Sequence, residues 1–269
     1  MSDTDKPITV RERLQLDDCD DDDCSHIPNH ELFQTGDLLL FSGRSLFPSR
    51  LIQDFTHSKY SHTGVILRDP VFEEESFKGL YILESTGYIN AKDVQTDKYV
   101  VGVQINKLSD VYKDVGGGTI YWRRLQAVRD KDFYQIFSLV HTLTYGKNYD
   151  FDPIDWIKAY FDIQDEWEQR EDRFICSALC SFLFDRLGLL EKPVHWTIVR
   201  PVDLGTEYPD KDRRVHFINC KMDDEIQIKF DSDLEREEED NAAKERKENP
   251  DASYASQLFS YLKSFVWQE

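Results

Sequence analysis

Positive charge is scarce in this sequence. The 269 residues include 33 Lys and Arg against 52 Asp and Glu, which gives a formal net charge of -19. Binding to nucleic acid or to an anionic membrane draws on clustered positive charge, so binding of either kind by bulk charge is disfavoured. We therefore expect no nucleic-acid partner.

Long apolar runs are also missing. No stretch approaches the roughly 20 apolar residues that span a bilayer, and the opening MSDTDKPITVRERL lacks the apolar centre of a secretory signal. We expect no transmembrane segment. Five cysteines, an odd number without such a signal, fit reduced thiols better than a disulfide framework, which predicts a cytoplasmic protein.

Long Gly/Ser linkers and internal repeats are absent, whereas two strongly acidic stretches are present. Residues 1–24 hold nine acidic and three basic residues, and residues 231–251 hold ten and four. Like charge at this density resists compaction. We predict a disordered acidic arm at 1–31, one folded domain at 32–230, a charged linker at 231–251 and an amphipathic aromatic helix at 252–269.

The last of these segments, SYASQLFSYLKSFVWQE, can place Tyr254, Leu258 and Tyr261 on one face of a helix. Because Lys263 is its only cation, docking on a protein is favoured over binding to an anionic membrane. A peripheral contact with protein or lipid through 252–269 is the partner interaction that we expect of this helix.

The central region contains apolar runs of two kinds. Short runs bounded by glycine or polar residues predict strands, and longer runs with a 3.6-residue period predict helices. The predicted strands lie at 35–43, 63–67, 79–87, after 116–118, 215–222 and 225–230, and the predicted helices at 48–58, 130–146, 152–167 and 176–188. Strands gather first and helices later, which favours an α+β fold.

The run FICSALCSFLF, at 174–184, contains two cysteines four residues apart. Cys176 falls at the start of a predicted helix, where the unpaired N–H groups and the helix dipole stabilise a thiolate. Cys180 falls one turn deeper among large apolar residues, where desolvation raises the pKa of a thiol. Cys176 is thus the candidate nucleophile, and Cys180 is predicted to be a core residue.

A thiolate nucleophile needs a base, and His62 is the candidate. It opens the strand SHTGVIL, follows a polar turn and precedes the small residues Thr63 and Gly64. Glu84, in YILES, is a carboxylate amid apolar strand residues and needs a partner there. If the two strands are neighbours, Glu84 can hold one imidazole nitrogen while the other faces the sulfur.

Five short motifs follow one another along the chain: TGDLLLF, SHTGVIL, YILEST, YGKNYDF and FICSALC. In this order they resemble the permuted NlpC-like papain-fold proteins of the YiiX type, over roughly 35–188. The matching residues are Gly36-Asp37, Ser61-His62-Thr63-Gly64, Glu84, Tyr149-Asp150 and Cys176-Ser177. The resemblance implies a circularly permuted papain-like domain in which an antiparallel sheet packs against helices and the histidine precedes the cysteine.

The same resemblance implies a cysteine-dependent hydrolase, a peptidase or amidase, that cleaves an amide bond through a thioester. Cys176 would be the nucleophile, His62 the base and Glu84 the group that orients His62. For substrate contacts we expect Tyr60, Tyr149 and Ser177. We expect neither a cofactor nor a metal.

Two other functions remain open. One is a lipid acyltransferase or phospholipase of the lecithin-retinol-acyltransferase-like branch, in which the aromatic insert at 150–173 and the helix at 252–269 would face lipid. The other is a non-catalytic binding module on the same fold. The presence of Cys176, His62 and Glu84 together speaks against the binding module.

Other candidate residues have plainer readings. The N-terminal arm holds four residues that could ligate zinc: Cys19, Cys24, His26 and His30. All four fall within twelve residues, with no folded segment between them to form the core of a zinc-binding domain. An unstructured acidic arm is favoured there. His141 lies within an apolar helix and is predicted to be a core histidine, and His57 is predicted to cap the end of a helix.

Overall fold

The structure is a computed structural model, and it describes residue 27 and the ranges 29–43, 58–72, 75–88, 91–114, 118–152 and 169–228. The predicted helices at 48–58 and 152–167 fall almost wholly outside these residues, as do the predicted linker and C-terminal helix. No helix within the described ranges is long and apolar enough to cross a membrane.

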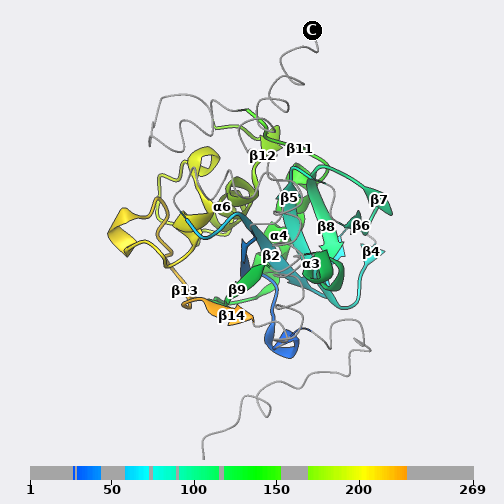
Figure 1. Cartoon of the computed structure of the whole chain (residues 1–269), viewed down its shortest axis with the longest axis horizontal. Helices are drawn as coiled ribbons and strands as arrows, with labels where there is room; N and C mark the ends of the chain where they lie inside the picture. Colours follow the sequence, from blue (N-terminus) through cyan, green and yellow to red (C-terminus); the bar gives the residue numbers. More distant parts are fainter. Residues whose placement is uncertain are drawn as a thin grey trace, which may run out of the picture.

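An eight-stranded sheet forms the centre of the molecule (Figure 1). Its strand order is β14-β9-β1-β2-β5-β8-β6-β7, and the neighbouring strands whose register is known all pair antiparallel. In chain order the strands are β1 (Leu38–Ser42), β2 (His62–Arg68), β5 (Leu80–Thr86), β6 (Lys92–Asp93), β7 (Lys98–Tyr99), β8 (Gly102–Lys107), β9 (Thr119–Arg123) and β14 (Ile226–Ile228). The antiparallel α+β architecture expected from the sequence is therefore confirmed.

Three two-stranded ribbons and seven helices lie around this sheet in the described residues. The ribbons pair β3 (Val71–Phe72) with β4 (Glu75–Ser76), β10 (Leu125–Gln126) with β13 (Lys221–Met222), and β11 (Asn148–Tyr149) with β12 (Arg173–Phe174). The α-helices are α3 (Leu108–Asp114), α4 (Lys131–Thr144) and α6 (Cys176–Arg186), and the 3-10 helices are η1 (His30–Leu32), η2 (Trp196–Ile198), η3 (Pro201–Leu204) and η4 (Asp210–Asp212).

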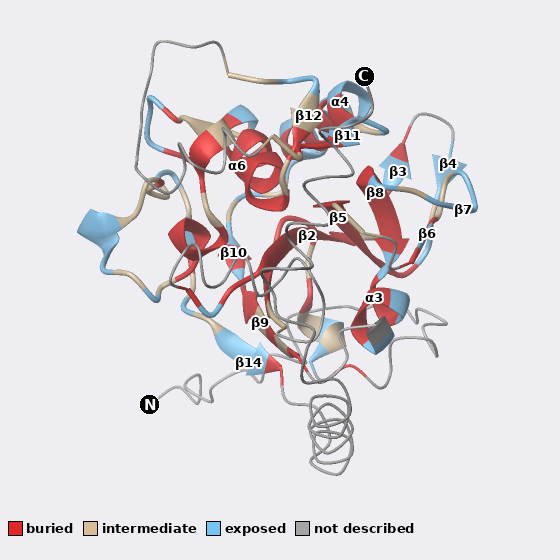
Figure 2. Ribbon diagram, turned by 45° about the horizontal axis from the view of Figure 1, so that its top comes forward, coloured by how far each residue is buried: buried red, intermediate tan, exposed pale blue. Residues whose placement is uncertain are grey.

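Both faces of the sheet are covered. Val65 and Leu67 of β2 belong to a core that includes residues of α4 and α6, whereas Ile66 between them belongs to a second core with residues of α3. Figure 2 shows α6 and α3 on opposite sides of the buried strands β2 and β5. A strand buried on both faces needs apolar residues at successive positions, which explains runs such as LLLF.

The long helix α4 follows the pattern that predicted it. The Asp130 side chain accepts a hydrogen bond from the N–H of Phe133 at 3.0 Å, as an N-cap does, and Gly146 just beyond the helix has a φ of 71°. The apolar stripe that includes Phe133, Phe137 and Val140 is buried. The helix predicted at 130–146 is thus confirmed.

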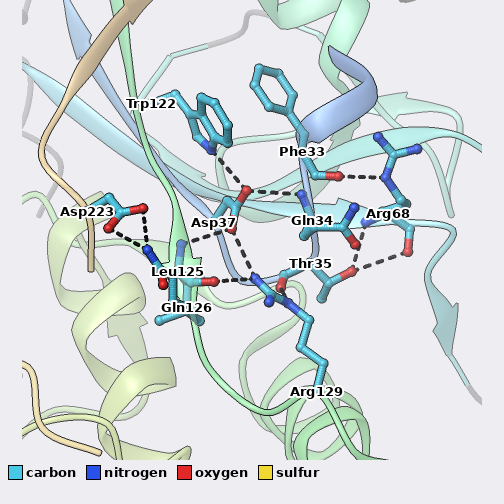
Figure 3. Close-up of polar contacts among 10 residues, drawn as sticks. All are labelled: Phe33, Gln34, Thr35, Asp37, Arg68, Trp122, Leu125, Gln126, Arg129 and Asp223. Carbon is cyan, nitrogen blue, oxygen red and sulfur yellow. Dashed lines mark hydrogen bonds and ion pairs between the residues drawn. The ribbon is translucent and has the colours of Figure 1, made fainter. Parts of the chain in front are cut away.

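Asp37 joins the start of β1 to the segment that leads into α4 (Figure 3). Its Oδ1 accepts from the N–H of Leu125 at 3.0 Å and from Nη2 of Arg129 at 3.1 Å, and its Oδ2 accepts from the N–H of Gln34 at 3.0 Å and from Nε1 of Trp122 at 2.9 Å. Burial, the largest influence, raises the pKa of Asp37 above its ordinary value in spite of these four donors. The Asp37 carboxylate therefore holds the fold together and lies apart from the candidate site.

The structure corrects two boundaries. Ile27 was placed in the acidic arm, yet it is buried in the second core, and Arg68 donates to the carbonyl oxygens of His30 and Phe33. The packed chain thus begins before residue 32. The predicted strand at 215–222 is also shorter than expected, because only β13 and an isolated bridge between Phe217 and Leu190 form there.

Candidate active site

Cys176 is the first residue of α6, as the helix pattern predicts. The ribbon of β11 and β12 pairs Tyr149 with Phe174, and Ser85 of β5 donates to the carbonyl oxygen of Phe174 at 2.7 Å. Ile175 is extended, and its carbonyl oxygen accepts the first helical hydrogen bond, from Leu179 at 3.1 Å. The strand-to-helix turn thereby places the Cys176 thiol at the positive end of the helix.

His62 and Glu84 lie on adjacent strands. Gly64 of β2 pairs with Glu84 of β5, so Glu84 is diagonal to His62 on the same face of the sheet. Nε2 of His62 lies 2.5 Å from Oε2 of Glu84. A Cβ at Gly64 would lie 2.5 Å from Cδ1 of Ile82, so glycine lets the two strands carry this pair without a clash.

Asn106 of β8 contacts Glu84 from the other side. Its Nδ2 donates to Oε1 of Glu84 at 2.7 Å, and both side chains are fully buried. Sequence reasoning missed this residue, because it did not predict the strand β8 and nothing local marks the polar positions of VQINK as buried. No local signal distinguishes a polar face in water from one that is buried.

The thiol of Cys176 and the imidazole of His62 interact, and each shifts the pKa of the other. Because Glu84 occupies Nε2 of His62, we infer that Nδ1 is the ring nitrogen that faces the sulfur. Burial by itself disfavours charge on His62, but Cys176 and then Glu84 more than offset this and raise the pKa of His62 to about 10. The imidazole is therefore held protonated at neutral pH.

The pKa of the Cys176 thiol is shifted in the opposite direction. Burial by itself would raise the pKa of Cys176, but the charged His62 and the N–H groups of Thr63 and Ser177 more than offset it. The net result is a pKa of Cys176 below its ordinary value. The opposite shifts of the two pKa values favour a thiolate–imidazolium pair over two neutral groups.

Cys180 differs from Cys176 as the sequence predicted. It is fully buried, and burial raises the pKa of its thiol well above the ordinary value. It belongs to the core that packs α6 on the sheet. Of the two cysteines in α6, only Cys176 has the electrostatic surroundings of a nucleophile.

The predicted substrate residues are engaged inside the protein. Tyr60 is fully buried and its hydroxyl donates to Oε1 of Glu225 at 2.6 Å, and the hydroxyl of Ser177 donates to the carbonyl oxygen of Val199 at 2.6 Å. Tyr149 is buried, with its ring 4.8 Å from that of Phe151. These contacts give Tyr60 and Ser177 packing roles, and a contact of any of the three with substrate stays a prediction.

Of the remaining histidine and cysteine candidates, some lie in the described residues and the others lie outside them. Burial lowers the pKa of His141 to about 4, and its Nε2 lies 2.7 Å from Oε1 of Gln95, so it is a neutral core histidine as predicted. His57 and three of the four residues of the considered zinc site, Cys19, Cys24 and His26, lie outside the described residues. The segments on which the lipid alternative rests, most of 150–173 and all of 252–269, lie outside them too.

The three candidate catalytic residues are deeply placed. Cys176 is 2% exposed, His62 9% and Glu84 0%. A thiolate–imidazolium pair that excludes water is screened little, so each charge strongly stabilises the other. The arrangement can supply a nucleophile, a proton donor and acceptor, and a carboxylate that holds the imidazole.

Of the comparisons with known proteins, the one with solved structures gives a match. No protein-family model and no curated protein matches the sequence. Among solved structures, the chain is similar to the crystal structure of the metalloprotein YiiX from Escherichia coli O157:H7, at 25% sequence identity and a TM-score of 0.40. The similarity covers 59% of this chain and 70% of that one.

Proposed function

We propose that this protein is a cysteine-dependent hydrolase that cleaves an amide bond through a thioester intermediate. The observation that carries the proposal is the connected set Cys176–His62–Glu84, in which the pKa of the thiol is lowered and that of the imidazole is raised. A buried core cysteine has the opposite behaviour, as Cys180 shows in the same helix.

In the first half of the reaction, the Cys176 thiolate attacks the carbonyl carbon of the amide. In this mechanism the N–H groups at the start of α6 stabilise the negative charge that develops on the carbonyl oxygen. As the C–N bond breaks, the proton on Nδ1 of His62 passes to the leaving amine. The acyl group remains on Cys176 as a thioester, and His62 is neutral.

In the second half, water attacks the thioester while Nδ1 of His62 accepts a proton from it. The C–S bond then breaks, which releases the carboxylic acid and restores the thiolate–imidazolium pair. Throughout, the Glu84 carboxylate accepts a hydrogen bond from the Nε2–H group of His62, which keeps Nδ1 directed at the sulfur. Every proton in this cycle is moved by His62.

The YiiX structure is described as that of a metalloprotein. In the described ranges of this chain, no group of three or more His, Cys, Asp or Glu side chains is arranged to hold a metal ion. Nε2 of His62, a nitrogen that could ligate a metal, is engaged by Glu84. The mechanism proposed here uses only the side chains of Cys176, His62 and Glu84 and the N–H groups at the start of α6.

Acylation of the protein by p-nitrophenyl acetate tests the proposal. We expect one acetyl group on Cys176 at neutral pH, seen by intact-mass and peptide mass spectrometry, followed by continued release of p-nitrophenolate. Cys176→Ala should abolish both, and Cys180→Ala, a matched change one helical turn away, should retain both. Acetylation of folded protein that persists in Cys176→Ala would contradict the proposal.

Substrate class is then tested with fluorogenic peptide amides and with acyl-lipid esters in parallel. Turnover of an amide that depends on Cys176 supports the amidase or peptidase proposed here. Turnover confined to acyl-lipid esters, or acyl transfer to an alcohol in place of water, would replace it by the lipid acyltransferase alternative.

A further inference from the structure

We propose that Asn106 is a positioning residue of this site, which fixes the Glu84 carboxylate so that it holds His62 charged and correctly oriented. This inference rests on the proposed function and extends the set Cys176–His62–Glu84 by one residue. Asn106 touches neither the sulfur nor the imidazole in any recorded hydrogen bond, and acts through Glu84.

The register of three strands brings the residues together. Strand β5 lies between β2 and β8, with Glu84 opposite Gly64 on one side and opposite Gln104 on the other. Asn106 is two residues beyond Gln104, so it approaches Glu84 diagonally, as His62 does from β2. One carboxylate oxygen thus meets Nε2 of His62 at 2.5 Å and the other meets Nδ2 of Asn106 at 2.7 Å.

The hydrogen bond from Asn106 to Glu84 leaves the other polar atom of the amide unpaired, which costs free energy. A carboxylate can only accept hydrogen bonds, so the amide must present its NH2 group to Glu84. Its other atom, Oδ1, is buried and has no hydrogen-bond partner in the part of the chain that the structure describes. A buried unpaired acceptor is unfavourable, and a leucine of similar size would avoid it. The charge-assisted bond to Glu84 accounts for a polar residue at this position.

The charged and polar groups around Glu84 determine how the loss of Asn106 changes the charge of the Glu84 carboxyl. His62 contacts it from β2, the thiol of Cys180 on α6 lies within electrostatic range, and β8 presents the neutral side chains of Gln104 and Asn106. Asp93 of β6 is opposite Asn106 but accepts from the N–H of Ile105 and the hydroxyl of Tyr145.

On α3, Asp110 and Lys113 are largely exposed and lie near each other. Asn106 is therefore the neutral donor that stabilises Glu84 as an anion from the side opposite His62. Without it the buried carboxyl takes up a proton more readily, stabilises the imidazolium less, and so stabilises the Cys176 thiolate less.

The experiment is the pH dependence of iodoacetamide alkylation at Cys176, read by peptide mass spectrometry on the full chain. In Asn106→Leu we expect the inflection to move upward by about one pH unit, with a roughly tenfold slower rate below it. Asn106→Asp keeps the size and shape of the side chain but replaces the donor by an acceptor, and should shift the inflection the same way. If Asn106→Leu does not fold, the inflection of Asn106→Asp tests the inference.

The matched control is Ile105→Ala, which truncates the fully buried neighbour on the opposite face of the same strand. It should lower the melting temperature and leave the inflection in place. A wild-type inflection in the folded Asn106 variants, with only a lower melting temperature, would overturn this inference and leave the proposed function standing. The absence of a low-pH inflection in the wild-type protein would instead overturn the proposed function, and this inference with it.

Discussion

The hydroxyl of Thr63 lies 3.2 Å from the sulfur of Cys180. The backbone N–H of the same residue interacts with the sulfur of Cys176. Thr63 follows His62 directly, so one strand contacts both cysteines of α6 and also supplies the histidine. This explains how two thiols one helical turn apart acquire opposite properties, since only Cys176 shares its surroundings with a charged imidazole.

Removal of the imidazole tests the ion pair. In His62→Ala we expect the pKa of Cys176 to rise above its ordinary value, because burial is then opposed only by the N–H groups. The thiolate should disappear from the neutral range, and the ultraviolet absorbance of thiolate should appear only at alkaline pH. Cys176→Ala identifies the absorbance that belongs to this sulfur. An unchanged titration in His62→Ala would contradict the pairing.

Glu84→Gln keeps the shape of the side chain and removes its charge. We expect p-nitrophenyl acetate turnover to fall at least tenfold, because a neutral amide stabilises the imidazolium less and presents a different set of hydrogen bonds to Nε2. The measurement is steady-state release of p-nitrophenolate near neutral pH.

Asp203→Asn is the control for that change, since Asp203 is a buried carboxylate whose partner is Arg200, a residue that we assign no part in the site. It should cost stability while the rate stays within about twofold of the wild-type value. Equal rate losses in the two variants would mean that Glu84 acts on stability alone.

The pH dependence of stability is predicted at His141. Its pKa is lowered by burial to about 4 in the folded protein, against about 6.5 when unfolded, so the unfolded state binds the extra proton. Stability from this group is therefore complete above pH 6.5 and is lost as pH falls toward 4, by up to ~3 kcal/mol.

Urea unfolding across that pH range, compared between wild type and His141→Gln, isolates the contribution of His141. The wild-type free energy of unfolding should fall relative to that of the variant as the pH drops. A difference between the two proteins that stays constant from pH 7 to pH 4 would refute the assignment.

Asp37→Asn should destabilise the fold by roughly 2–4 kcal/mol, because a neutral amide then faces four donors and Arg129 loses its ion pair with Asp37. The check is the midpoint of urea unfolding at neutral pH. Asp223→Asn, a change of the same kind at a carboxylate that pairs with the exposed Lys221 and accepts from Gln126, should cost much less. Comparable losses in both variants would show that the Asp37 contacts are not special.

Local pattern was enough to predict several elements. Strands at 35–43, 63–67 and 79–87 are observed as β1, β2 and β5, and the helices at 130–146 and 176–188 as α4 and α6. In each case the apolar period and the bounding residues act within a few positions of each other. The same reasoning did not anticipate β8 or α3, whose stretches at 102–114 mix apolar and charged residues without a clear boundary.

The sequence by itself thus determined that Cys176 opens a helix, that His62 opens a strand and that Glu84 lies within another. It could not determine that β5 lies between β2 and β8, nor the register of these strands, because pairing depends on contacts between residues far apart in the chain. Only the tertiary structure placed Asn106 against Glu84 and buried Tyr60 and Ser177. Burial is a property of the packed whole, since a side chain is removed from water by segments that its own neighbours in sequence do not specify.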